Sequence, residues 1–189
     1  QTDASMGITQ TNTRFFSVSG AKVQPTCNGG SDGSITLTVT DNFGADPNNF
    51  SYSWTGPNGF VANTKDLSGI TAGTYVVDVA YTNPASGNTN SCSYTFTVGE
   101  PSVVTCNVSN VTDIDCFGNA NGSITVSGSG GTGSGYTYSL SAIGPFSSTN
   151  TFNTLTPGSY TIYVKDSNGC DAPNPCTVTV DEPSALGCN

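Results

Sequence analysis

Apolar residues alternate with serine and threonine along most of this chain, and a period of two predicts β-strands. The pattern is clearest in residues 34–40 and 123–127. Six further segments share it, namely 50–54, 75–81, 93–98, 136–140, 160–164 and 177–180. Asp-Gly, Asn-Gly, Gly-Gly and Pro-Gly pairs separate these segments and predict turns. Because no window has the i, i+3, i+4, i+7 spacing of an amphipathic helix, the sequence predicts an all-β protein.

The chain contains the same series of motifs twice. The pattern C-x5-G-S-I-T begins at Cys27 and again at Cys116, 89 residues later. Residues 97–102 recur as residues 179–184 at an offset of 82, so the order is kept while the spacing shrinks. A period of this length indicates tandem whole domains rather than a solenoid of short repeats. We expect one domain in residues 1–101, with an N-terminal extension, and a second in residues 102–189.

A tyrosine follows a glycine turn at the same place in both repeats. The motif L/I-x-x-G-x-Y ends at Tyr75 and at Tyr160. It resembles the tyrosine corner of immunoglobulin-like sandwiches, in which the tyrosine hydroxyl bonds back to upstream backbone. Together with short, regularly spaced strands, it predicts two tandem immunoglobulin-like β-sandwich domains.

The full series of motifs resembles a known repeat family. C-x-G-x3-G-S-I, Y-x-Y/W, L-x-x-G-x-Y-x-x-x-V, D-x-N-G-C and T-V-x-E-P follow one another as in the SprB-type repeat of large secreted surface adhesins of gliding bacteria. The resemblance covers residues 23–101 and 112–184. The second repeat keeps D-x-N-G-C at residues 166–170, whereas the first has a longer loop that ends at Cys92. The resemblance implies export by a dedicated secretion system and a place in a long extracellular adhesin or filament.

Composition narrows the class of function. Charged residues make up 9% of the chain, and thirteen acidic residues face four basic ones. Neutralising phosphates needs clustered Lys and Arg, so nucleic acid is excluded as a partner. No apolar run approaches the roughly 20 residues that span a bilayer. Seven cysteines in a chain with little charge indicate an oxidising compartment, and we expect an extracellular, cell-surface location.

The sequence offers little chemistry for catalysis. It has no histidine, the most common general base, and no nucleophile or phosphate-binding motif. Its only glutamates, Glu100 and Glu182, occupy equivalent linker positions in different repeats. We therefore expect no enzymatic activity, no catalytic residue and no cofactor.

The residues that could bind a metal or a sugar each have a simpler structural interpretation. Segments 41–46 and 166–171 loosely resemble calcium loops, but their spacing is incomplete and Asx residues form turns without a metal, so we expect none. Trp54 is the best candidate for stacking on a sugar, with Tyr52 on the same strand face. Because Trp54 aligns with Leu140 in the second repeat, a core position is the favoured interpretation.

Three disulfides are expected. Each repeat has one cysteine at its opening and one in its late hairpin, which pairs Cys27 with Cys92 and Cys116 with Cys170; each closed loop would contribute about 4 kcal/mol. Cys106 and Cys176 have no counterparts in the first repeat, so we expect them to pair with each other. The rival to this third bridge is Cys176 with Cys188.

Cys188 is the odd cysteine. Residues 182–188 repeat residues 100–106, the entry into the second repeat, so the C-terminal tail resembles the start of a third. We expect Cys188 to make an intermolecular or array contact, and the ends of the chain to meet further protein by continuation of an array or by strand addition.

Two functions fit these observations. The first is a non-enzymatic structural or adhesive segment of an extracellular filament, stalk or cell-surface adhesin, whose partners are other copies or further repeats joined end to end. The second is a carbohydrate-binding accessory module of a larger secreted protein, with surface polysaccharide as its partner. An exposed aromatic platform would favour the second.

Overall fold

The computed structural model describes residues 16–186, which form strands, turns and two short 3-10 helices, η1 (Pro47–Asn49) and η2 (Pro57–Gly59). The chain folds into two compact units. Of the described residues, the first unit comprises those from Phe16 to Val23, Ser34–Ser68 and Gly73–Val98. The second comprises those from Gly99 to Leu186, together with Gln24–Gly33 and Gly69–Ala72 from the first sequence repeat.

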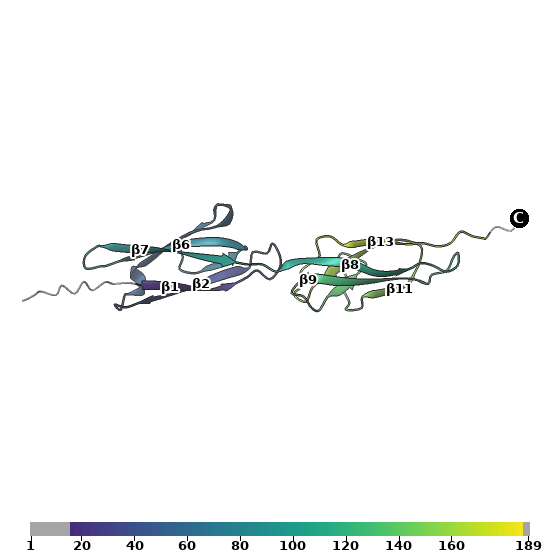
Figure 1. The fold of residues 1–189 in the computed structure, drawn as a ribbon, viewed down its shortest axis with the longest axis horizontal. Coiled ribbons are helices and arrows are strands. Elements are labelled where there is room, and N and C mark those ends of the chain that lie inside the picture. Colours follow the sequence, from purple (N-terminus) through teal and green to yellow (C-terminus); the bar gives the residue numbers. More distant parts are fainter. Residues whose placement is uncertain (1–15, 187–189) are drawn as a thin grey trace, which may run out of the picture. The chain divides into compact units, whose positions relative to one another are not determined.

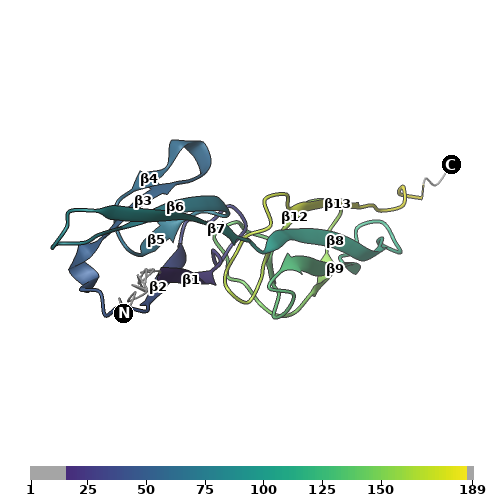
Figure 2. The ribbon, with the colours of Figure 1, turned by 60° about the vertical axis from the view of Figure 1, so that its left-hand side comes forward.

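The first unit is built on two sheets, drawn as two layers in Figure 2. One sheet has the order β1-β2-β5 and the other β4-β3-β6-β7. The strands are β1 (Phe16–Val23), β2 (Gly33–Asp41), β3 (Phe50–Thr55), β4 (Val61–Ala62), β5 (Leu67–Ile70), β6 (Gly73–Thr82) and β7 (Thr89–Val98).

Alternation along the strands fills the core of the first unit. In β2 the side chains of Ile35 and Leu37 are buried, and the threonines that follow each of them are exposed. Val77 and Val79 on β6 repeat the pattern, because successive side chains of a strand point to opposite faces. Burying these apolar faces against each other is the main favourable term in the folding of such a sandwich.

The second unit also has two sheets, of order β11-β9-β8 and β10-β12-β13 (Figure 1). Its strands are β8 (Ser102–Thr112), β9 (Gly122–Gly131), β10 (Thr137–Ser139), β11 (Thr151–Leu155), β12 (Gly158–Lys165) and β13 (Cys176–Val180). Both sheets contribute to one core, with Ile124 and Val126 from β9 and Ile162 and Val164 from β12.

The all-β, immunoglobulin-like prediction is confirmed in each unit. The Tyr160 hydroxyl donates a hydrogen bond to the backbone oxygen of Thr156 at 2.8 Å, which is the bond expected of a tyrosine corner. Tyr75, at the equivalent place in the first unit, is fully buried with the Phe60 ring edge-on to its own at 5.4 Å. The hydrogen bond of Tyr160 ties the start of β12 to the turn that precedes it.

Candidate functional site

The candidate site is a pair of loops that each carry a cysteine and are each hydrogen-bonded to a glutamate distant in the sequence. We call residues 26–33 the first cysteine loop and residues 115–122 the second cysteine loop. Each leads into a strand, β2 or β9, and ends on the buried glycine with which that strand begins. In the first cysteine loop the backbone oxygen of Cys27 accepts a hydrogen bond from Gly30 at 2.9 Å, so the chain turns directly after the cysteine.

Carboxylates hold the first cysteine loop from both sides. Glu100 Oε2 accepts a hydrogen bond from the backbone N–H of Gly29 at 2.7 Å. Asp32 Oδ1 accepts one from the backbone N–H of Thr26 at 2.9 Å, and its second oxygen accepts the Thr26 hydroxyl. The bonds from the side chain and backbone of Thr26 lower the pKa of Asp32. Because each carboxylate satisfies a backbone donor, the loop keeps one conformation.

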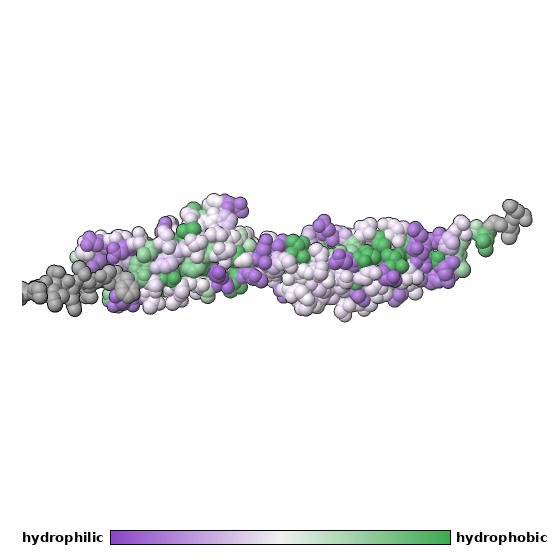
Figure 3. Space-filling view, viewed as in Figure 1, coloured by the Kyte–Doolittle hydropathy of each residue, from purple (hydrophilic) through white to green (hydrophobic). Residues whose placement is uncertain are grey.

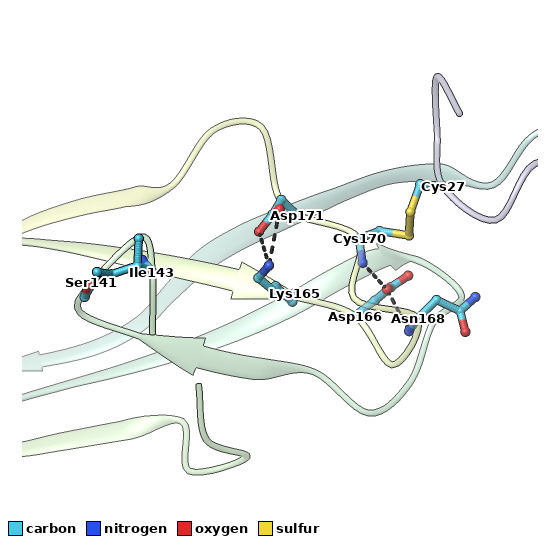
Figure 4. A network of polar contacts seen from close by, with 8 residues as sticks. All are labelled: Cys27, Ser141, Ile143, Lys165, Asp166, Asn168, Cys170 and Asp171. Carbon is cyan, nitrogen blue, oxygen red and sulfur yellow. Dashed lines mark hydrogen bonds and ion pairs between the residues drawn. A yellow bond between two sulfur atoms is a disulfide. The ribbon is translucent and has the colours of Figure 1, made fainter. Parts of the chain in front are cut away.

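Cys27 is bonded to Cys170 on the loop that follows β12. Their Cα atoms are 5.5 Å apart, within the range of an ordinary disulfide (Figure 4). We call residues 166–170 the Asp166 loop. The Cys170 sulfur also lies 3.5 Å from the backbone oxygen of Thr26, so the bridge is packed against the first cysteine loop.

A buried acid shapes the Asp166 loop. Asp166 Oδ1 accepts hydrogen bonds from the backbone N–H groups of Cys170 at 2.9 Å and Asn168 at 3.0 Å, and Oδ2 accepts one from Thr132 at 3.1 Å. Burial alone would raise the pKa of Asp166, but the N–H groups of Cys170, Thr132 and Asn168 hold it below the ordinary value. Gly169 has φ +83°, a conformation that glycine adopts without strain. The acid thus fixes the backbone on which Cys170 stands.

A second disulfide joins the two sheets of the second unit. Cys106 on β8 bonds to Cys176 on β13, with Cα atoms 5.5 Å apart. This is the pair that the sequence singles out, and it leaves Cys176 unable to pair with Cys188, which lies outside the described residues.

The other two expected bridges need correction. Cys27–Cys92 and Cys116–Cys170 do not form; Cys92 and Cys116 are the free cysteines of the described chain, and both are exposed. Within a repeat the two cysteines belong to opposite ends of the sandwich. The second cysteine loop is bonded near Glu182, beyond the end of β13 that pairs with the start of β12, whereas Cys170 follows the end of β12. An eight-residue strand spans roughly 25 Å, far beyond the 7 Å limit for bridged Cα atoms.

The Asx-rich segments use their carboxylates for turns. Asp41 Oδ1 accepts the backbone N–H groups of Phe43 at 2.9 Å and Ala45 at 3.0 Å. Asp46 caps η1 by accepting the backbone N–H of Asn48. Residues 16–186 bring together no group of three or more His, Cys, Asp or Glu side chains that could hold a metal ion.

The aromatic candidate for sugar binding lies in the core. Trp54 is fully buried, and its indole N–H donates to the backbone oxygen of Thr64 at 2.9 Å. Tyr52, on the same strand, is half-buried beside a hollow that Phe50 and Lys65 also line. Trp54 therefore offers no face to a ligand, which removes the main support for a carbohydrate-binding module.

One element of the site escaped sequence reasoning. The partner of Cys27 is the late-hairpin cysteine of the following repeat, whereas each repeat was expected to close on itself. A signal was present, because the C-x5-G loop occurs in both repeats but D-x-N-G-C occurs only in the second. Asp166 does form the Asx turn expected of segment 166–171, but this turn was not expected to carry the cysteine that pairs with Cys27.

Comparisons with known proteins concern the repeat and its fold. The family model of the SprB repeat matches residues 19–59 and 108–144. A search of curated proteins found no match. Among solved structures, the three N-terminal domains of the Hoc outer capsid protein of bacteriophage RB49 superpose with a TM-score of 0.53 at 19% identity, over 88% of this chain and 58% of that one. This chain thus spans little more than half of the Hoc structure, and the likeness concerns the fold.

Two further structures are more distant. The fibronectin(III)-like modules of Clostridium thermocellum CbhA give a TM-score of 0.34 at 13% identity, over 89% of this chain and 94% of that one. An intimin fragment solved with the intimin-binding domain of Tir gives a TM-score of 0.37 at 18% identity, over 88% of this chain and 64% of that one. No helix in residues 16–186 has the length and hydrophobicity needed to cross a membrane.

Proposed function

We propose, on the premise that the chain carries two SprB repeats, that it is a load-bearing, non-enzymatic segment of an extracellular adhesin or filament at the cell surface. The repeat family and the sandwich fold are both typical of structural domains. The carboxylates of the cysteine loops and the Asp166 loop bind backbone N–H groups, and the described cysteines are either paired or exposed. Two disulfides suit an oxidising location outside the cytoplasm.

The observation that carries this proposal is the covalent path through Cys27 and Cys170. Their sequence separation is 143 residues, so most of the chain lies inside one disulfide-closed loop. A pulling force applied at the two ends passes from Cys27 through the sulfur–sulfur bond to Cys170. The residues between them carry none of that tension after the folded units give way. A segment of this kind can extend only slightly under load.

Force spectroscopy on the chain, held by handles at its two ends, tests the proposal. Complete extension of the reduced chain should exceed that of the oxidised chain by about 50 nm, since 143 residues become free to extend at about 3.4 Å each. Equal lengths with and without reductant would contradict the load-bearing role.

The Cys27→Ser variant gives a matched intermediate. Tension then passes through the Cys106–Cys176 bond, which still shields a separation of 70 residues. The oxidised variant should therefore gain about 25 nm over the oxidised parent, half of the full increase. Labelling of intact, unpermeabilised cells with antibodies against the chain tests the location separately, and labelling only after lysis would overturn it.

A further inference from the structure

The two cysteine loops have the same hydrogen-bonded structure. The backbone N–H of Gly118 donates to Glu182 Oε2 at 3.0 Å, as that of Gly29 donates to Glu100 Oε2 at 2.7 Å. In each loop the backbone oxygen of the cysteine accepts a hydrogen bond from the backbone N–H of the residue three positions later. The distance is 3.1 Å in the second cysteine loop and 2.9 Å in the first. The second loop is therefore built as the first is.

A third bond repeats with a change of residue. Asn121 Oδ1 accepts the backbone N–H of Asp115 at 3.4 Å, where Asp32 accepts that of Thr26. Amide and carboxylate oxygens serve the same backbone donor, so the loop tolerates either side chain. The turn that presents the cysteine is thus complete in the second cysteine loop without any partner.

The two loops differ in what they hold. Cys27 is joined to Cys170 of the Asp166 loop, whereas Cys116 is an exposed thiol. Phe117 follows it with 59% of its surface exposed, at the position where the first loop has Asn28. The second cysteine loop therefore presents a reactive group and an apolar ring to solvent.

A hollow beside Cys116 adds an independent observation. It measures about 480 Å³ and is lined by residues 115–117 and 183–186. Residues 182–186 repeat residues 100–104, so Leu186 corresponds to Val104. Val104 is 3% exposed in the core of the second unit, but Leu186 is 98% exposed. Green, hydrophobic areas lie beside purple ones at this C-terminal end of the described chain (Figure 3).

We propose that the second cysteine loop binds the D-x-N-G-C loop of a further repeat of this type and forms a disulfide with its cysteine through Cys116. The first cysteine loop already binds a loop of this kind, because Cys27 is bonded to Cys170 of the Asp166 loop. A second copy of the chain offers no such free loop, because its Cys170 is already paired. Its free Cys92 lies within β7, opposite Val79 of β6.

The bond forms by exchange with an external disulfide such as oxidised glutathione. The Cys116 thiolate attacks one glutathione sulfur and releases the first glutathione. The cysteine thiolate of the incoming loop then attacks the Cys116 sulfur of the mixed disulfide and releases the second. Two protein thiols are oxidised to one disulfide, while oxidised glutathione is reduced to two thiols that carry the two protons.

An extended chain tests this partner directly. Residues 1–188 followed by residues 107–189 add one repeat in register, because Cys188 corresponds to Cys106. Refolding with oxidised and reduced glutathione, then alkylation and peptide mapping without reduction, should find Cys116 bonded to the added copy of Cys170. A marker substitution in the added repeat distinguishes its peptides. Alkylation of Cys116 should fall from about one per chain to near zero, since tethering raises the effective concentration of the partner.

Matched variants define the outcomes. Replacing the added copy of Cys170 with serine should leave Cys116 fully alkylated, while Cys27–Cys170 remains intact. Cys116 still alkylated beside a folded added repeat would overturn the inference, as would Cys116 bonded to Cys92 of another chain. If the added repeat does not fold, its copy of Cys176 will be found unpaired. In that case a second extended chain, residues 1–181 followed by residues 100–189, repeats the test. The inference deepens the proposed structural role and rests on it, but the pulling experiment depends on the Cys27–Cys170 and Cys106–Cys176 bonds and not on Cys116, so either can fail alone.

Discussion

The carboxylate of Asp166 accepts the backbone N–H of Cys170 at 2.9 Å, so a buried acid holds the residue whose sulfur bridges to Cys27. This relationship couples a folded loop to a long-range covalent bond. Without the hydrogen bonds of Asp166, the Cys27–Cys170 bond would remain, but the backbone that carries Cys170 would be less rigid.

Replacing Asp166 with asparagine should destabilise the second unit. An asparagine oxygen can accept from Cys170 and Asn168 or from Thr132, but its amide N–H₂ then faces the remaining N–H donors. We expect a loss of about 1–3 kcal/mol in the free energy of unfolding, measured in urea, because a buried donor loses its acceptor. In Asp171→Asn, which breaks only the exposed 3.2 Å ion pair with Lys165, the loss should stay below about 1 kcal/mol.

The same acid should make stability depend on pH. Its pKa is lowered in the folded chain, so the stabilisation is complete above the unfolded value of about 3.9 and is lost as pH falls through the folded pKa. Urea midpoints measured between about pH 6 and pH 2 should drop more steeply for the parent than for Asp166→Asn. Parallel curves would refute this, since Asp32, Asp41 and Asp115, whose pKa values are also lowered, remain in both proteins.

Removing the Cys106–Cys176 bridge should lower the free energy of unfolding by more than the Asp166→Asn substitution does. The Cys106→Ser/Cys176→Ser double variant frees a loop with a sequence separation of 70 residues, and the chain-entropy model gives a loss of about 4 kcal/mol in the free energy of unfolding. Denaturant unfolding of the second unit measures it. Cys92→Ser, at an exposed free thiol, is the matched control and should leave the midpoint unchanged. Equal midpoints for all three proteins would show that the bridge does not restrict the unfolded chain.

Gly20 should be intolerant of a side chain. A β-carbon at this position of β1 would meet three atoms of the Phe96 ring at 2.5–3.0 Å. Gly20→Ala should therefore destabilise the first unit by about 1–3 kcal/mol, seen as a lower thermal midpoint, because the ring must leave its packing position. Gly99→Ala, whose nearest neighbour would be Gln24 Oε1 at 3.8 Å, should have little effect. A thermal midpoint for Gly20→Ala equal to that of Gly99→Ala would show that the ring yields freely.

Strands were predictable where alternation is regular and missed where it breaks. Segments 34–40 and 75–81 lie within β2 and β6, because each strand buries every second residue. β8 was not predicted, since its pairing with β9 shifts register between Val108 and Asn110 and mixes polar with apolar positions. The longer loop expected to end at Cys92 is shorter in the structure, because its last four residues form the exposed start of β7.

The all-β class and the two repeats follow from the sequence alone, which also favoured Cys106 and Cys176 as partners over the rival pair of Cys176 and Cys188. Each of these rests on a local period or on a comparison of one repeat with the other. The pairing of Cys27 with Cys170, and with it the role of the Asp166 turn as the support of that bridge, emerged from the folded chain. The physical reason is that a disulfide needs its two Cα atoms within about 7 Å, and no local pattern states which loop of which repeat comes that close to Cys27.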